Sequence, residues 1–434
     1  MSTEKVEKMA FKFIQSQKQN SLALFSRLWI VPIFLSVAIR LPSIFRGYFT
    51  GPHQGRQMQT LWPVYYWTEH GFSPLHSHFY ISGKNQIWDM EFPVYQWICF
   101  GIHEITGINL VIASKLITLV ASVISAILVF KISQKLNLTY TSSFCALLVF
   151  CLSPFSLYWG SVGMIDNLAI ALGLFALNIS FDKNSNAKHF VYLTSLILAT
   201  LIKPNIGATY FLVCVFLQLM RKGERFKAIF LDGLFIFSVT LAWSIYAKFD
   251  SSLGTVVSGL TWFFGTPKQY LETPYNFVGN FSRLLPSIIG LLAALILIFG
   301  ITFLKKPREY SVLLVACLFE VLVFANVNFQ DYYQISIIPI VALLLAGGFE
   351  GYLGILAKFA NRRRVELASL VLIFVLLLFS SKDGISTIYI DSIFNRAPDQ
   401  SNKYYQGPNS TSYKEFMNYT WKDAQEPINS LSNK

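Results

Sequence analysis

The sequence predicts an all-α, polytopic membrane protein whose helices cross the bilayer about eleven times. Of its 434 residues 54% are hydrophobic and 13% are charged, whereas soluble domains carry roughly 25% charged residues. Stretches such as 284–304 and 311–327 are apolar over nearly their whole length, which is about the ~20 residues that a helix needs to cross a bilayer. Their hydrophobicity is continuous rather than alternating, which favours helices over a membrane β-barrel.

The predicted spans follow one another along most of the chain. They cover residues 22–42, 109–131, 142–160, 164–181, 189–203, 205–220, 228–247, 284–304, 310–327, 334–356 and 365–381. The boundary at Lys203–Pro204 leaves two alternatives, because proline either ends or bends a helix. If the segments on its two sides form one kinked span, the count becomes ten and the C-terminal tail changes sides.

The orientation in the membrane follows from the basic residues. Lys and Arg gather in the N-terminal segment and in short connections such as 221–227, 305–308 and 358–364, whereas 159–163 and 328–333 contain none. Cytoplasmic loops carry the excess of Lys and Arg, so we expect the N-terminus inside the cell. The same bias accounts for the net charge of +12, and we therefore expect no nucleic-acid partner.

This orientation divides the chain into three parts. Residues 1–21 form a cytoplasmic N-terminal segment without a cleavable signal peptide, 22–382 the membrane domain, and 383–434 a polar tail on the outer side. Two outer loops, 43–106 and 250–283, are long and rich in aromatic residues. Loops of this composition favour short helices that lie on the membrane surface.

Several polar residues are expected at the outer mouth of the bundle. Asp89 and Glu91 are either solvated loop charges or functional carboxylates. Glu91 stands directly before Phe92–Pro93 and an apolar run. Partial burial at this position would raise the pKa of its carboxyl group and make it a better base. Asp166 and Lys203 lie near the outer ends of their spans. Ionisable groups there are functional, form a structural ion pair, or extend toward water.

A polar turn between two spans adds further candidates on the same face. Asp331, Tyr332 and Tyr333 lie within the stretch NFQDYYQISIIP. Alone, this turn is typical of the aromatic belt at a membrane interface. Together with Arg56, Glu91, Asp166 and Lys203 it predicts a cluster of polar groups on the outer face, and this convergence carries more weight than any single residue.

A metal site is weakly indicated. His76 and His78 are spaced by two on a loop, and His53 or His70 are potential additional ligands, but this spacing is weakly specific and we expect no metal cofactor. The five cysteines all fall in apolar stretches and are expected to act as small hydrophobic residues. The sequence contains no P-loop, no dinucleotide-binding glycine motif and no nucleophile elbow.

Five stretches in order resemble the GT-C membrane glycosyltransferases, in particular bacterial relatives of the dolichyl-phosphate-mannose–protein mannosyltransferases. They are H-x-x-R-Q-x-Q-T at 53–60, E-F-P-x-Y at 91–95, SPFSLYWG with MIDNLAIAL at 153–172, Lys203–Pro204, and DYYQISIIP at 331–339. Each motif alone is loose. The ordered set covers about residues 25 to 350 and is fairly specific.

The resemblance implies a GT-C fold and a transferase that moves a sugar from a polyprenyl-phosphate donor to a glycolipid, saccharide or protein acceptor with inversion. Glu91 would be the general base, with Asp89 as a second candidate, and Arg56 and Lys203 would bind the donor phosphate. Further roles in orienting acceptor or basic partners and in binding substrate are implied for Asp166, His53, Gln57, Asp331, Tyr332 and Tyr333. The implied location is the bacterial inner membrane, with the site facing outward.

The chain departs from the family's pattern at one important place. Relatives carry an acidic residue just before the His–Arg–Gln stretch, whereas this chain has Gly51 and Pro52 there. Either Glu91 takes over the role of base, or the chain is a divergent or inactive member. Two alternative functions therefore stay open, a flippase or transporter of lipid or saccharide, and a non-catalytic partner in polysaccharide assembly.

Overall fold

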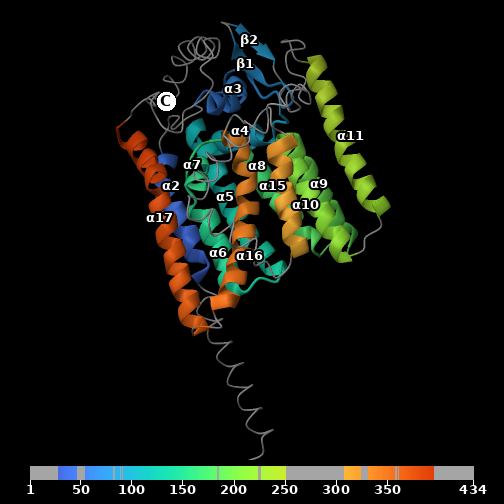
Figure 1. The fold of residues 1–434 in the computed structure, drawn as a ribbon. Helices are drawn as coiled ribbons and strands as arrows, with labels where there is room; N and C mark the ends of the chain where they lie inside the picture. Colours follow the sequence, from blue (N-terminus) through green and yellow to red (C-terminus); the bar gives the residue numbers. More distant parts are fainter. Residues whose placement is uncertain are drawn as a thin grey trace, which may run out of the picture.

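The computed structural model shows a bundle of helices with a small two-stranded hairpin at one end (Figure 1). It describes residues 28–45, 54–81, 84–87, 89, 91–182, 185–222, 226–250, 307–323, 331–356, 359 and 361–394. Helices α5 (Leu110–Lys135), α11 (Phe226–Asp250) and the segment 335–356 are long and apolar enough to cross a membrane, and several shorter helices are also apolar. The chain is thus a helical, polytopic membrane protein.

The remaining elements complete the bundle in chain order. They are α2 (Ile30–Ile44), α3 (Gln54–His70), β1 (His78–Ile81), β2 (Lys84–Ile87), α4 (Val94–Thr106), α6 (Tyr140–Leu152), α7 (Pro154–Trp159), α8 (Asp166–Ser180), α9 (Asn186–Ile202), α10 (Pro204–Lys222), α15 (Pro307–Val323), the 3₁₀ helix η2 (Asp331–Ile337), α16 (Ile338–Leu356) and α17 (Arg362–Phe394). Each predicted span overlaps a described helix, except 284–304, which lies outside the described residues. The span 142–160 is divided into α6 and α7, and 334–356 begins within η2 before it continues as α16. Residues 22–27 and 324–327 of two further spans lie outside the described residues.

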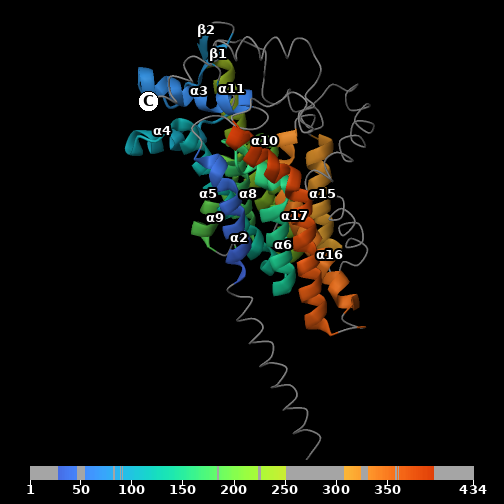
Figure 2. The same ribbon diagram turned by 90° about the vertical axis from the view of Figure 1, so that its left-hand side faces the viewer.

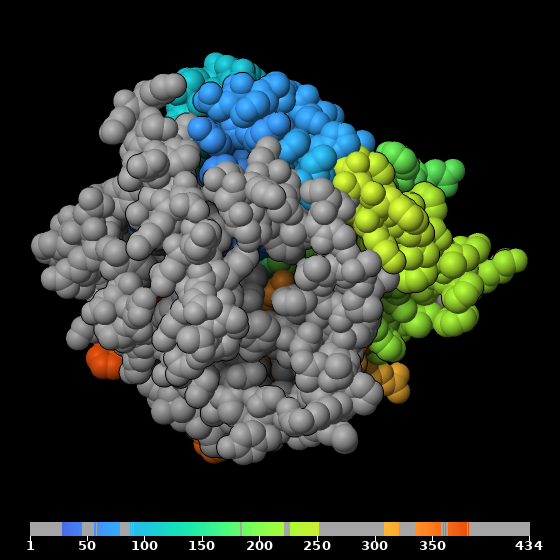
Figure 3. All heavy atoms as spheres, turned by 90° about the horizontal axis from the view of Figure 1, so that it is seen from above, coloured from blue at the N-terminus to red at the C-terminus, as the bar shows by residue number. Residues whose placement is uncertain are grey.

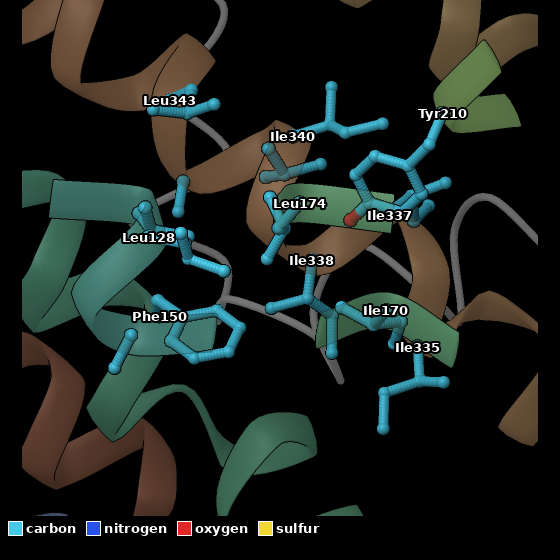
Figure 4. Packing of buried hydrophobic residues seen from close by; sticks show 14 of the residues in the cluster. Leu128, Phe150, Ile170, Leu174, Tyr210, Ile335, Ile337, Ile338, Ile340 and Leu343 are labelled. Atoms are coloured by element: carbon cyan, nitrogen blue, oxygen red, sulfur yellow. The ribbon is translucent and has the colours of Figure 1, made fainter. Parts of the chain in front are cut away.

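The core of the bundle forms around α16. Its side chains Ile340 and Leu343 pack against residues of α5, α6, α8 and α10, including Leu128, Leu174 and Tyr210 (Figure 4). Nearly all of α16 is buried, whereas α11 stands at the edge of the bundle and exposes a row of large apolar side chains. In a membrane protein such a row faces lipid, so α11 is a peripheral span.

The helices begin and end where the sequence supplies the matching residues. Asn109 and Thr139 each accept backbone N–H groups at the first turn of α5 and α6, and Gly107 ends α4 in the left-handed region with φ of 68°. Pro154 separates α6 from α7, and the Ser153 side chain caps the new helix. Since helix ends leave backbone groups unpaired, these caps fix the positions of the breaks.

One end of the bundle carries the elements of the first long loop. Helices α3 and α4 lie across this end, and β1 and β2 pair antiparallel above them (Figure 2). We call it the hairpin end, because α3 and the β1–β2 hairpin lie there. The two helices were predicted for this loop, whereas the hairpin was not. The second predicted loop, 250–283, lies outside the described residues apart from Asp250, and α17 continues to Phe394, beyond the predicted end at 381.

The junction at Lys203–Pro204 resolves into two helices. Lys203 leaves α9 with an extended backbone, φ −150° and ψ 98°, and α10 begins at Pro204. The two helices pack against each other directly after the turn. Gly207 makes this approach possible, because a Cβ atom at this position would lie 2.5 Å from the Cα of Thr200 in α9.

We predict that Gly207→Ala destabilises the protein by roughly 1–3 kcal/mol, as overpacking of a close contact typically does. The added methyl group would meet the hydroxyl of Thr200 and also its backbone N and Cα atoms, which a change of side-chain rotamer cannot move aside. The temperature of unfolding in detergent micelles measures the effect. Gly101→Ala is the matched control, because open space surrounds a Cβ there and alanine favours a helix. Equal unfolding temperatures for the two variants would contradict the close approach.

Candidate functional site

Five side chains from five different segments meet at the hairpin end. Arg56 of α3 donates a hydrogen bond to the carboxylate of Glu91. The ammonium Nζ of Lys203 lies 3.5 Å from Glu91 Oε1 and 3.7 Å from Asp166 Oδ1. The same ammonium lies 4.4 Å from the centre of the Tyr333 ring, within range of a cation–π interaction. We call Arg56, Glu91, Asp166 and Lys203 the charge network.

Glu91 is held in place by the chain that follows it. The N–H of Phe92 donates to the carbonyl of Leu201, 3.1 Å away, and so fastens this loop to the last turn of α9. The ring of Phe92 meets Trp97 and Trp243 edge to face. This bond lies two residues before Lys203, and Glu91 and Lys203 are therefore brought together by backbone as well as by charge.

Asp166 is positioned by a tight turn against α5. The Thr118 hydroxyl donates to the carbonyl of Met164 and accepts the N–H of the same residue. A Cβ atom added to Gly163 would lie 2.8 Å from the Cβ of Ser114, so the turn and α5 are in close contact. Asp166 is the first residue of α8, where the helix dipole stabilises a carboxylate. Only 1% of its surface is exposed, and neither oxygen receives a hydrogen bond from another residue in the part of the chain that the structure describes.

The network combines two buried cations with the buried carboxylate of Asp166 and the partly buried carboxylate of Glu91. Burial favours the neutral form of Glu91, but the charges of Arg56 and Lys203 outweigh it and hold the pKa of Glu91 below its usual value. This corrects the sequence-based expectation that burial would raise that pKa. Glu91 is thus ionised at neutral pH and, in this state, a weaker base than expected.

Half of the ten residues predicted for the site are brought together in it. The five that lie together, as predicted, are Arg56, Glu91, Asp166, Lys203 and Tyr333. Gln57 follows Arg56 in α3 and is fully buried. His53 lies outside the described residues, as do the side chains of Asp331 and Tyr332, whose backbone belongs to η2.

Asp89 belongs to a second cluster. One of its oxygens accepts the N–H of Ser77 at 2.6 Å, and His76, Asp89 and Asp250 place their donor atoms within 4.8 Å of one another. Burial, together with the neighbouring Asp250, raises the pKa of Asp89 to about 7. The predicted pairing of His76 with His78 differs from this arrangement, since the ring of His78 stacks on Tyr66.

Sequence reasoning missed Glu320 of α15. Its carboxylate is fully buried and accepts hydrogen bonds from Asn205, at 2.5 Å, and from Thr209, both near the start of α10. The signal was available, because Glu320 is the one ionisable residue in the apolar run 311–323 and such residues within a span are usually functional or paired. It fixes α15 against the helix that follows Lys203.

The arrangement suits an anionic ligand that also carries hydroxyl groups. Arg and Lys side chains bind phosphate oxygens, and a carboxylate with unused acceptor capacity binds a hydroxyl. Arg56 and Lys203 supply the first kind of group, and Asp166 supplies the second. All of these groups are largely withdrawn from solvent, where electrostatic interactions are stronger than in water.

We predict that Asp166→Asn and Lys203→Met are coupled in a double-mutant cycle by about 0.5–3 kcal/mol, because buried partners share one interaction. The free energy of unfolding in detergent micelles is the measured quantity. Lys135 and Asp182 form a more exposed pair at 2.6 Å, and the same two substitutions there should show a coupling of only about 0.2–1 kcal/mol. Additive effects at Asp166 and Lys203 would contradict a direct pair.

No family model and no curated protein matches the chain. Solved structures do resemble it. ArnT from Cupriavidus metallidurans superimposes with a TM-score of 0.53 in its apo state, at 12% identity, over 87% of this chain and 75% of ArnT. ArnT bound to undecaprenyl phosphate gives 0.51 at 11% identity, over 86% and 74% of the two chains.

A third solved structure has a related architecture. The oligosaccharyltransferase of Archaeoglobus fulgidus in its apo form gives a TM-score of 0.50 at 13% identity, over 91% of this chain and 59% of that protein. Identities this low establish a common fold and no more. The superpositions confirm, at the level of the fold, the resemblance that the ordered motifs indicated. The chain has the fold of the GT-C membrane glycosyltransferases.

Proposed function

We propose that the protein is an inverting glycosyltransferase that moves a sugar from a polyprenyl-phosphate donor to an acceptor hydroxyl at the hairpin end. The observation that carries this proposal is the charge network, in which Arg56 and Lys203 flank Glu91 within a GT-C fold. The ArnT structure bound to undecaprenyl phosphate supports a lipid phosphate as the leaving group. The acceptor is a glycolipid, a saccharide or a protein.

The donor phosphate would bind where the two cations already neutralise a carboxylate. Arg56 and Lys203 turn part of their hydrogen-bonding capacity from Glu91 to the phosphate oxygens, and they stabilise the charge that develops there as the sugar–phosphate bond breaks. An added negative charge beside Glu91 raises the pKa of its carboxyl group. Donor binding would therefore convert Glu91 from a stabilised anion into a useful base.

Glu91 would then take the proton from the acceptor hydroxyl while that oxygen attacks the anomeric carbon from the face opposite the phosphate. The polyprenyl phosphate leaves in the same step, so the configuration at the anomeric carbon is inverted. Asp166, whose oxygens have unused acceptor capacity, orients the acceptor. We assign further substrate contacts to Tyr333 and Gln57 and, following the motif resemblance, to His53, Asp331 and Tyr332.

The proposed place of action is the outer face of a bacterial inner membrane. The basic connections predict that the hairpin end faces away from the cytoplasm, and a lipid-linked donor supplies an activated sugar on that side without a nucleotide. The site groups act on the donor without any metal ion in this proposal. Asp89 has no role in proton transfer here, since it joins His76 and Asp250 instead.

We predict that Glu91→Gln lowers kcat for sugar transfer by about 10²–10⁴-fold, the usual contribution of a general base. Purified protein, a defined polyprenyl-phosphate sugar and a chromatographic assay of the product provide the measurement. Glu104→Gln is the matched control, because Glu104 is exposed in α4, and it should leave kcat unchanged. Full turnover by Glu91→Gln would remove this residue from the mechanism, and translocation or inactivity of the wild type would favour one of the two alternative functions.

The pH dependence gives an independent prediction. Since Arg56 and Lys203 hold the pKa of Glu91 below 4.5, the free protein loses its base only as the pH falls through that lowered value, and the acid limb of kcat/KM should lie below 4.5. The acid limb of kcat reports the donor complex and should lie at higher pH, because the phosphate raises the pKa. Arg56→Met should move the limb of kcat/KM upward. The proposal would be contradicted if kcat and kcat/KM had their acid limbs at the same pH and Arg56→Met did not shift either of them.

A further inference from the structure

We infer that His76, Asp89 and Asp250 bind one divalent transition-metal ion, with Zn²⁺ as the best match, and that this ion fastens the hairpin segment to the end of α11. The three residues belong to the connection before β1, the loop after β2 and the last position of α11. Seen from the hairpin end, the atoms of α3 and the hairpin lie beside those of α11 (Figure 3). The cluster shares no residue with the charge network.

The spacing of the donor atoms fits a single ion. One ligand atom from each side chain lies within 4.8 Å of the other two, and His76 Nδ1 is 2.7 Å from Asp250 Oδ2. Zinc binds imidazole nitrogen and carboxylate oxygen at about 2.0–2.2 Å, which places ligand atoms about 3–4 Å apart. Small rotations of His76 and Asp250, both partly exposed, are enough to reach this geometry.

Asp89 supplies a second and independent observation. Its side chain is 5% exposed. Oδ1 accepts the N–H of Ser77, whereas Oδ2 is buried and has no hydrogen-bond partner in the described part of the chain. A buried carboxylate oxygen without a donor is costly, and one carboxylate oxygen of Asp89 lies within the group of ligand atoms. A bound cation would satisfy it.

A simple ion pair between His76 and Asp250 is the competing explanation. It accounts for the 2.7 Å contact, but it leaves the carboxyl group of Asp89 against that of Asp250, where the two groups must share a proton or repel each other. A divalent ion neutralises both carboxylates and is bound by the neutral imidazole through a ring nitrogen. The donor set also selects the metal, because imidazole favours zinc and its neighbours over magnesium or calcium. Three protein ligands leave room for water.

The position of the site gives the ion a structural consequence. Asp89 precedes Glu91 by two residues, so an ion that holds Asp89 against α11 also restrains the backbone that carries Glu91. The binding site itself does not depend on the proposed transfer reaction, and a binding measurement tests it without any assay of activity.

Titration of the chelator-treated full chain with Co²⁺, a spectroscopic substitute for zinc, tests the inference. We expect visible absorption that saturates at one ion per chain and is displaced by Zn²⁺. His76→Ala and Asp89→Asn should each weaken Co²⁺ binding by at least about 10–100-fold. Loss of a group that merely supports a metal ligand typically costs this much, and these two residues are ligands themselves. The matched controls His78→Ala and Asp182→Asn should bind as the wild type does, because His78 stacks on Tyr66 and Asp182 pairs with Lys135.

Absence of saturable binding at one ion per chain would overturn the inference, as would an unaltered affinity in Asp89→Asn. An equal loss in His78→Ala would overturn the assigned ligands. Zinc-edge X-ray absorption on the loaded wild type gives a test that needs no variant. One imidazole with oxygen ligands supports the site, whereas two or more imidazoles, or any thiolate, contradict it.

Discussion

The pairing of buried opposite charges around Lys203 is the interaction on which the hairpin end depends. An ammonium group that is 99% buried is tolerated only beside compensating charge, and Glu91 and Asp166 supply it at 3.5 and 3.7 Å. Each partner comes from a different segment, so the pairing holds together the loop before α4, the start of α8 and the turn between α9 and α10. Removal of one charge leaves the others buried without compensation.

If the proposed function holds, the same network explains how one site is stable without substrate and still suited to chemistry. In the absence of ligand the cations lower the pKa of Glu91, and the structure is stabilised at the expense of basicity. Proteins commonly pair ionisable groups in this way at functional sites, where the arrival of another charge shifts the balance. In the proposed reaction Asp166, whose oxygens have unused acceptor capacity, would bind the acceptor.

Much of the fold could be predicted, because the signals are local. Continuous apolar stretches predicted the helices, and Pro204 marked the break between α9 and α10. The break at Pro154 was not predicted, since the expected span 142–160 ran through it, whereas the structure divides it into α6 and α7. The orientation drawn from the basic connections stays a prediction. The hairpin was not predicted, since HFYI and KNQI are strands of only four residues each within a loop whose aromatic residues favoured surface helices. For short segments tertiary contacts outweigh local preference, and pattern alone does not separate strand from helix.

The sequence by itself determined the membrane class, the order of the helices and the candidate charges, because hydrophobicity and charge act through composition and position. Only the tertiary structure decided which charges meet. Arg56, Glu91, Asp166 and Lys203 are far apart in the chain, and their distances depend on packing such as the approach of Gly207 to Thr200. The same applies to Asp89, which was grouped with Glu91 by sequence but lies with His76 and Asp250 in space. Long-range packing sets such neighbours, and therefore also the pKa values that determine which group can act as a base.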